Sequence, residues 1–158
     1  MKPESFAGST PALEFEKYFA GETKGYGIIF TRGGEVRRQF VVEMHGKQNG
    51  DVFTLDEYFT FLDGERLTRQ WNVRRLDEHS YDATASDVVG SGQGRQFGSV
   101  VRWSYVLQVP VKGSTYNITM DDWMYLQEDG VMINRTKMSK FGIGVGEMVI
   151  TFRKPASS

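Results

Sequence analysis

Turn-forming residues recur along most of this 158-residue chain and separate runs rich in β-branched and aromatic residues. From Lys24 onward the interval is mostly about 10–17 residues, which is typical of an antiparallel meander. A chain divided in this way has no stretch in which a helix of any length is expected. The turn signals are Arg32-Gly33-Gly34, Asn49-Gly50, Asp63-Gly64, Asp77-Glu78, Gly90 to Gly94, Lys112-Gly113 and Asp129-Gly130.

Eight or nine strands are expected from these turns. The sequence therefore predicts an all-β fold, an antiparallel up-and-down meander that closes into a barrel of about 8–10 strands. Residues 1–158 form one domain, with a short lead-in segment over 1–20 and the barrel over 22–154. Within the lead-in, residues 1–10 are expected to be loose. Either Thr10-Pro11 starts a short helical turn, or extended chain leads to one tight turn closed by Gly21; the second is favoured.

Turn chemistry also predicts strand register. A two-residue turn at Asn49-Gly50 predicts the pairs Met44–Leu55, Val42–Glu57 and Phe40–Phe59. A three-residue loop at Leu62-Asp63-Gly64 predicts Phe59–Leu67, Glu57–Arg69, Leu55–Trp71 and Phe53–Val73, whereas a shorter loop would flip the second strand. A two-residue turn at Lys112-Gly113 predicts Val109–Tyr116, Leu107–Ile118, Tyr105–Met120 and Trp103–Asp122.

Composition narrows the functional classes. Charge is balanced, with 19 Lys+Arg against 20 Asp+Glu, so no overall field attracts nucleic acid, and no nucleic-acid partner is expected. Cysteine is absent, which excludes disulfides and thiolate ligands. No apolar run reaches the length of a membrane span, and the N-terminal residues contain no signal peptide. No cofactor, metal site or catalytic residue is predicted.

Several short motifs are discounted on physical grounds. The Gly90 to Gly94 run lacks the Lys-Ser/Thr of a phosphate-binding loop and is expected to be a flexible hairpin loop. His45 and His79 lie far apart in sequence, and although His45 could share one face with Glu43, two ligands do not make a metal site. Asp121 and Asp122 point to opposite faces of a strand, so they cannot act as a pair of carboxylates.

The inward face of the expected barrel mixes apolar and charged residues. The predicted ligand-binding set is Arg38, Phe40, Glu57, Phe59, Arg69, Trp71, Trp103, Met120 and Asp122. Buried charges must be paired, and Glu57 opposite Arg69 meets that need. Two interpretations stay open: the charged groups fill the interior as a satisfied network, or they orient a small ligand in a cavity.

The stretch from Asp121 to Glu147 is expected to form a hairpin with large side chains on both faces. With a three-residue loop at Glu128-Asp129-Gly130, Trp123, Tyr125 and Arg135 share the outer face. Arg135 is expected to stack on Trp123. Either the N-terminal segment covers this face, or the face contacts a partner.

The chain resembles a family of bacterial lipoproteins classed as domain-of-unknown-function family 3833. The resemblance covers nearly the whole chain and is carried by PESFAGSTPALEFEKYFAG, GYGIIFTRGGEVRRQF, LDEYFTFLDGE, DATASDVVGSGQG and above all DDWMYLQEDGVMINRTKMSKFG. It implies a lipocalin-like barrel and, in many members, a signal and a lipidated Cys ahead of this domain. It brings no established activity.

Two functions follow as hypotheses. The first is a non-enzymatic barrel on the periplasmic side of the bacterial envelope, anchored as a lipoprotein if a signal was trimmed and otherwise soluble in the cytoplasm. This barrel binds a small apolar or amphipathic, lipid-like ligand, with Arg38 or Arg69 holding an anionic head. The alternative is a structural or assembly module with a filled barrel, acting through the outer surface around Trp123, Tyr125 and Arg135. An enzyme ranks below both.

Overall fold

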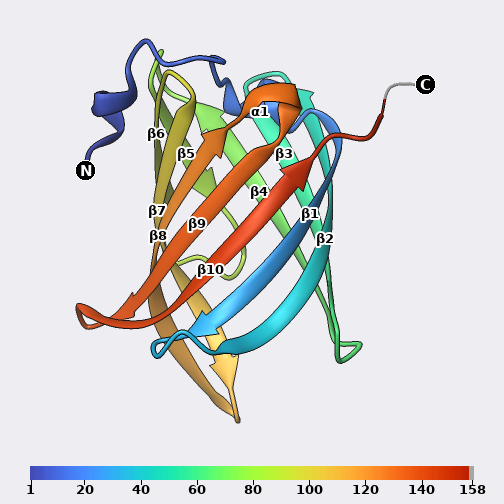
Figure 1. Cartoon of the computed structure of the whole chain (residues 1–158), viewed down its shortest axis with the longest axis vertical. Coiled ribbons are helices and arrows are strands. Elements are labelled where there is room, and N and C mark those ends of the chain that lie inside the picture. The colour runs from blue at the N-terminus through green and yellow to red at the C-terminus, as the bar shows by residue number, and fades with distance from the viewer. Residues whose placement is uncertain (157–158) are drawn as a thin grey trace.

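Ten antiparallel strands close into a barrel in which every strand pairs with its sequence neighbours and β1 pairs with β10 (Figure 1). The computed structural model describes residues 1–156. The strands are β1 (Gly21–Thr31), β2 (Val36–Asn49), β3 (Val52–Phe61), β4 (Arg66–Arg75), β5 (Ser80–Thr84), β6 (Gly92–Phe97), β7 (Val100–Val111), β8 (Ser114–Leu126), β9 (Met132–Lys140) and β10 (Ile143–Arg153). The helical pieces are η1 (Pro3–Phe6), α1 (Phe15–Tyr18) and η2 (Glu128–Gly130). The predicted all-β meander is confirmed.

Strand residues alternate between buried and exposed, as they must where one face of a sheet packs on a core and the other meets water. In β2, for example, Phe40, Val42 and Met44 are buried while the residues between them are not. The core occupies the inside of the barrel, and residues of α1 complete it.

Two of the three predicted registers are confirmed. All four pairs expected between β3 and β4 form, including Glu57 opposite Arg69, as do all four expected between β7 and β8. The β8–β9 hairpin also has the expected faces, with Trp123 opposite Arg135 and Tyr125 opposite Ile133.

The predicted β2–β3 register is wrong by two residues. Asn49 pairs with Val52, so the turn is Gly50-Asp51 rather than Asn49-Gly50. Gly50 has φ of 59°, and glycine is the residue that the first position of a II′ hairpin turn prefers. Because the shift is an even number of residues, every side chain keeps its predicted face, and Met44 rather than Val42 lies opposite Glu57.

Only Gly90 and Ser91 of the Gly90 to Gly94 run lie in the loop between β5 and β6, because β6 begins at Gly92. The indole ring of Trp103 lies against Gly94, where a Cβ would come within 2.9 Å of its atoms. Gly94 therefore serves close packing of an aromatic side chain, which a glycine in a strand permits.

The lead-in segment closes one end of the barrel, which we call the lead-in end. As favoured from the sequence, extended chain is followed by a single turn, α1, and Gly21 begins β1 with φ of 73°. Phe15 and Phe19 are buried inside this end, and their rings pack on Trp103 and Phe152 respectively. Among residues 1–156 no helix is long and apolar enough to span a membrane.

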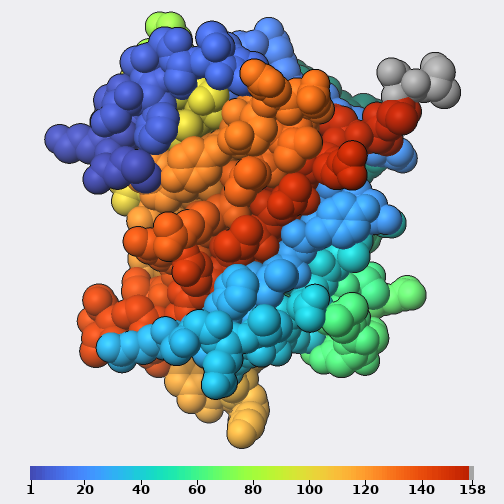
Figure 2. All heavy atoms as spheres, viewed as in Figure 1, coloured from blue at the N-terminus to red at the C-terminus, as the bar shows by residue number. Residues whose placement is uncertain are grey.

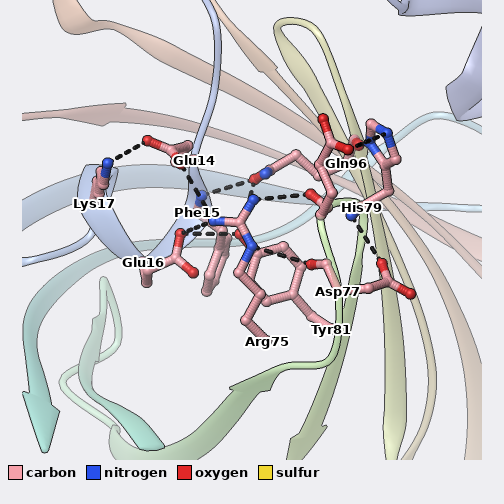
Figure 3. Close-up of polar contacts among 10 residues, drawn as sticks. Glu14, Phe15, Glu16, Lys17, Arg75, Asp77, His79, Tyr81 and Gln96 are labelled. Carbon is pink, nitrogen blue, oxygen red and sulfur yellow. Dashed lines mark hydrogen bonds and ion pairs between the residues drawn. The ribbon is translucent and has the colours of Figure 1, made fainter. Parts of the chain in front are cut away.

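A polar network fastens α1 to the barrel rim (Figure 3). Arg75, the last residue of β4, forms ion pairs with Glu14 and Glu16, each at 3.3 Å. Gln96 of β6 accepts a hydrogen bond from the Phe15 backbone N–H at 2.8 Å, and the Tyr81 hydroxyl lies within reach of both Glu16 and Gln96. Backbone and side-chain groups of the lead-in are thus satisfied where they enter the barrel.

Residues 1–10 are more ordered than expected, since η1 packs against β6 and β7. The Phe6 ring lies edge-on to Trp123 and Tyr125, with ring centroids 6.3 and 6.0 Å away. The N-terminal segment therefore covers Trp123 and Tyr125 on the outer face of β8, as one of the two interpretations expected, while Ile133 of β9 stays 41% exposed. Figure 2 shows this segment in dark blue lying over the strands at the lead-in end.

Gly46→Ala is expected to loosen the lead-in end. A Cβ at Gly46 would lie 2.0 Å from the backbone oxygen of Phe19. Either the lead-in segment at Phe19 or β2 at residue 46 would therefore have to move. We expect the free energy of unfolding to fall by about 1–3 kcal/mol, the usual cost of overpacking. Urea denaturation measures it, with Gly33→Ala as the control because that position is open. Equal stability of the two variants contradicts the close approach of the lead-in.

Candidate functional site

The barrel encloses a cavity of about 580 Å³. Aromatic, aliphatic and Met side chains from the strands and from α1 make up most of its wall. All nine residues predicted to bind a ligand line it: Arg38, Phe40, Glu57, Phe59, Arg69, Trp71, Trp103, Met120 and Asp122.

The cavity is closed at the lead-in end and open at the other. Phe15 and Phe19, which line it at the lead-in end, are 4% and 0% exposed. Leu67, Val111 and Tyr116 line it at the opposite end and are 40%, 40% and 39% exposed. We call this opposite end, formed by the β1–β2, β3–β4, β7–β8 and β9–β10 hairpins, the mouth.

Arg69 is the centre of a partly buried ion-pair cluster on the cavity wall. Its Nε and Nη2 atoms donate to the carboxylate of Asp87 at 2.9–3.0 Å, and its Nη1 lies 3.7 Å from Glu57. Glu57 also accepts a hydrogen bond of 3.0 Å from the Trp71 indole. The predicted Glu57–Arg69 pair is thus present, within a larger network.

Asp87 belongs to residues 85–91, the loop between β5 and β6. This loop continues the barrel wall beyond the ends of these two short strands. The Gln108 N–H donates to the Asp87 backbone oxygen at 2.8 Å, and Val88 forms an isolated bridge to Leu107 of β7. Since the Asp87 carboxylate grips Arg69 of β4, this single residue joins β4 to β7. Its role was missed from the sequence, because residues 85–91 carry no strand pattern.

Burial and charge shift the pKa values in this cluster. Burial works to lower the pKa of Arg69, but the bonds to Asp87 and the charge of Glu57 outweigh it, and the pKa is raised. Burial also raises the pKa of Glu57, and Arg69 only partly offsets this. The guanidinium is therefore firmly charged and already paired, so it holds its own carboxylates.

Asp122 is a second buried acid on the wall, 6% exposed. Burial raises its pKa to about 7, against the opposing hydrogen bonds of Asn134 and Thr136, and the charge of Glu57 adds to the rise. Asn134 donates to its carboxylate and to the Trp123 backbone oxygen. Asp121 points outward to Arg102 at 2.8 Å, as the alternation of strand side chains requires.

An unpaired donor lies on the same stretch of wall. Trp103 stands directly opposite Asp122 on neighbouring strands. Its Nε1 is buried and, among the residues described, has no hydrogen-bond partner. A buried donor of this kind costs free energy unless a bound group accepts from it.

Arg38, the other arginine of the predicted ligand-binding set, lines the cavity towards the mouth. It pairs with Asp63 and Glu65 and stacks 3.6 Å above the Phe61 ring.

The outer surface differs from the prediction in one contact. Trp123 is 8% exposed beneath Phe6. The stacking predicted for Arg135 is wrong: Arg102 lies 5.1 Å above the Trp123 ring, and Arg135 pairs with Glu147.

Tyr105 and Asn134 are two further wall residues that sequence reasoning did not select. The Tyr105 ring packs edge-on to Trp71 at 5.2 Å, and burial raises its pKa well above the ordinary value. Their inward position follows from the predicted registers, so the signal was present in the alternation of β7 and β9. Across residues 1–156 no group of three or more His, Asp or Glu side chains is placed to hold a metal.

Comparison with known proteins places the chain in a family. The model of a family described as proteins of unknown function, DUF3833, matches residues 1–154. The chain belongs to the DUF3833 family. Among curated proteins none matches its sequence.

A solved structure shares the fold of this DUF3833 protein. It is a protein of unknown function of the DUF3598 family from Nostoc punctiforme, with a TM-score of 0.57 and 13% identity. The match covers 93% of this chain but only 51% of the Nostoc protein, so the chain spans about half of that protein's length. At this identity the likeness concerns the fold alone.

Asp122→Asn is expected to flatten the dependence of stability on pH. The folded chain holds a proton on Asp122 up to about pH 7, while the unfolded chain releases it near the ordinary value of 3.8. This contribution is complete below the ordinary pKa and disappears as pH rises through 7, an effect of roughly 4 kcal/mol for a shift of this size.

Urea denaturation between pH 4 and pH 8.5 measures it. The free energy of unfolding of the unmodified chain should fall relative to that of Asp122→Asn as pH rises. Asp121→Asn is the matched control, because that carboxylate lies outside the barrel beside Arg102. Parallel pH profiles for the chain and Asp122→Asn contradict a buried, protonated Asp122.

Proposed function

We propose that this barrel is a non-enzymatic carrier of a small ligand with an apolar body and a hydroxyl or amine head. The observation that carries the proposal is the cavity itself, about 580 Å³ and closed at one end. Ligand sites usually have about 300–1,000 Å³, mostly apolar walls and a few convergent polar groups. The wall described above has that composition.

The charges on the wall favour this kind of head over an anionic one. Glu57 and Asp87 both pair with Arg69 on the wall, and Asp122 adds a third carboxyl group, while Arg37, Arg38 and Glu65 also line the cavity. Arg69 and Arg38, the two residues expected to hold an anionic head, are both occupied by carboxylates. At either of these arginines an incoming carboxylate would have to displace Asp87 or Glu65, whereas a hydroxyl or ammonium meets free acceptor capacity.

A hydroxyl head fits the stretch between Trp103 and Asp122 in particular. A hydroxyl both donates and accepts hydrogen bonds. It can accept from the unpaired indole Nε1 of Trp103 and donate to the buried carboxyl of Asp122 on the neighbouring strand. An apolar tail then extends towards the mouth along Phe59, Leu107 and Met138. This arrangement describes an amphipathic, lipid-like molecule, and we place its source in the bacterial envelope, as the resemblance to lipoproteins implies.

The alternative, an assembly module, has less support. It requires a filled barrel and an accessible surface at Trp123 and Tyr125. The interior contains a cavity, and Phe6 covers both aromatic side chains from outside.

Acid–base catalysis is a second candidate for one reason. Glu57 and Asp122 share the cavity, and both have raised pKa values, which is common at catalytic sites. Mass spectrometry of ligand recovered after incubation separates the two functions: a carrier returns it unchanged, whereas an enzyme converts it and loses this activity in Asp122→Asn.

Isothermal titration with decanol, decylamine and decanoate tests the proposed carrier at pH 8. The three probes share one tail and differ in the head, so their order reports the electrostatics of the wall. We expect saturable binding of one molecule per chain, with decanol and decylamine at least tenfold tighter than decanoate. Ile118→Trp should weaken binding by placing a larger side chain in the path of the tail.

Thr119→Trp is the matched control, because Thr119 is the next residue of β8 and points outward. Tightest binding of decanoate would overturn the proposed head chemistry. Failure of all three probes to bind would overturn the carrier itself.

A further inference from the structure

Large apolar side chains are exposed around the mouth. They come from every one of the four hairpins there: Val36, Leu62, Leu67, Val111, Tyr116, Phe141, Ile143 and Val145. Leu62 is 75% and Phe141 91% exposed, each at the tip of its hairpin. Tips this apolar are unusual, since turns are normally polar, and a cluster of them marks an interaction surface.

The backbone of Phe141 has a left-handed conformation, which is rare for an aromatic residue. Its φ is 52°, in the left-handed region where glycine, asparagine and aspartate are common and bulky side chains are rare. The side chain also gains little from burial, as it is 91% exposed. An aromatic residue kept under strain and in water points to a function outside the folded chain.

The two ends of the barrel differ in charge as well. The turns at the lead-in end, over 50–51, 76–79, 98–99 and 127–131, contain Asp and Glu and no Lys or Arg, and the one basic residue directly beside them, Arg75, is paired with Glu14 and Glu16. At the mouth each hairpin has a basic residue at or beside its turn: Arg32, Arg66, Lys112 and Lys140. Glu35, Asp63 and Glu65 share this end, and Arg38 pairs with the last two.

Basic and apolar groups at the mouth are interleaved. Lys140 Nζ lies 4.0 Å above the Tyr116 ring and 5.4 Å from that of Phe141, so one ammonium joins the β7–β8 and β9–β10 hairpins. Figures 1 and 2 show the four hairpins together at one end, with β7–β8 projecting farthest. Separate tips around an opening suit a deformable partner better than a rigid protein surface.

We propose that the mouth docks on an anionic lipid bilayer. Phe141, Leu62 and their neighbours enter the boundary between headgroups and acyl chains, and the basic residues contact lipid phosphates. Docking brings the opening of the cavity to the membrane, where an amphipathic ligand resides. The proposal rests on the proposed carrier function only for the cargo.

Sedimentation with vesicles tests the docking. We expect the chain to sediment with phosphatidylcholine vesicles that contain phosphatidylglycerol, to be released by salt, and to bind pure phosphatidylcholine at least tenfold more weakly. Leu62→Asp/Phe141→Asp should reduce binding by at least tenfold. Aspartate tolerates the left-handed region, so the variant should fold. Leu76→Asp, an exposed apolar residue at the lead-in end, is the matched control.

Three results overturn the proposal: no sedimentation, equal sedimentation with both lipid compositions, or equal binding by the mouth variant. A dimer seen by analytical ultracentrifugation and lost in the mouth variant also overturns it, because the surface is then a contact between copies. Decanol titration in free solution keeps the two proposals apart. Intact decanol binding without vesicle binding removes docking alone, and the reverse removes the carrier function alone.

Discussion

Arg69 and its two carboxylates are the interaction on which the rest of the barrel depends. A guanidinium inside a barrel must be paired, because the desolvation of a lone charge costs several kcal/mol. Asp87 meets this need from a segment outside the regular strands, and in doing so it draws residues 85–91 across the gap left by β5 and β6. The same pairing leaves an excess of carboxyl groups on the wall, which favours a hydroxyl or amine over an anion as the bound head.

The lead-in gives the barrel its polarity from end to end. Phe15 and Phe19 plug one end, and Arg75 and Gln96 hold them there through Glu14, Glu16 and the Phe15 backbone. The cavity then opens at the mouth, where the hairpin tips are apolar and basic. A barrel with one closed end, and with apolar and basic residues around its open end, suits a carrier that takes up its ligand from a membrane surface.

Local chemistry made much of this architecture predictable. The Leu62-Asp63-Gly64 and Lys112-Gly113 turns determined the faces and the partners of four strands, and all nine predicted site residues line the cavity. The prediction was wrong where two local solutions compete: glycine can occupy either position of a two-residue turn, so Asn49-Gly50 gave the wrong partners but the right faces. Gly92 and Gly94 resembled a loop because their packing against Tyr105 and Trp103 is a tertiary contact. The role of Asp87 could not be predicted for the same reason, because its ion pair with Arg69 is also a tertiary contact.

The central claim is that the interior is a ligand cavity whose polar wall selects a hydroxyl or amine head. A crystal structure of the chain grown with decylamine tests it most directly. The account predicts continuous ligand density inside the barrel, with the nitrogen within hydrogen-bond distance of Asp122 or Glu57 and the tail directed to the mouth. An interior filled by its own side chains, or density for decylamine only on the outer surface, would contradict it.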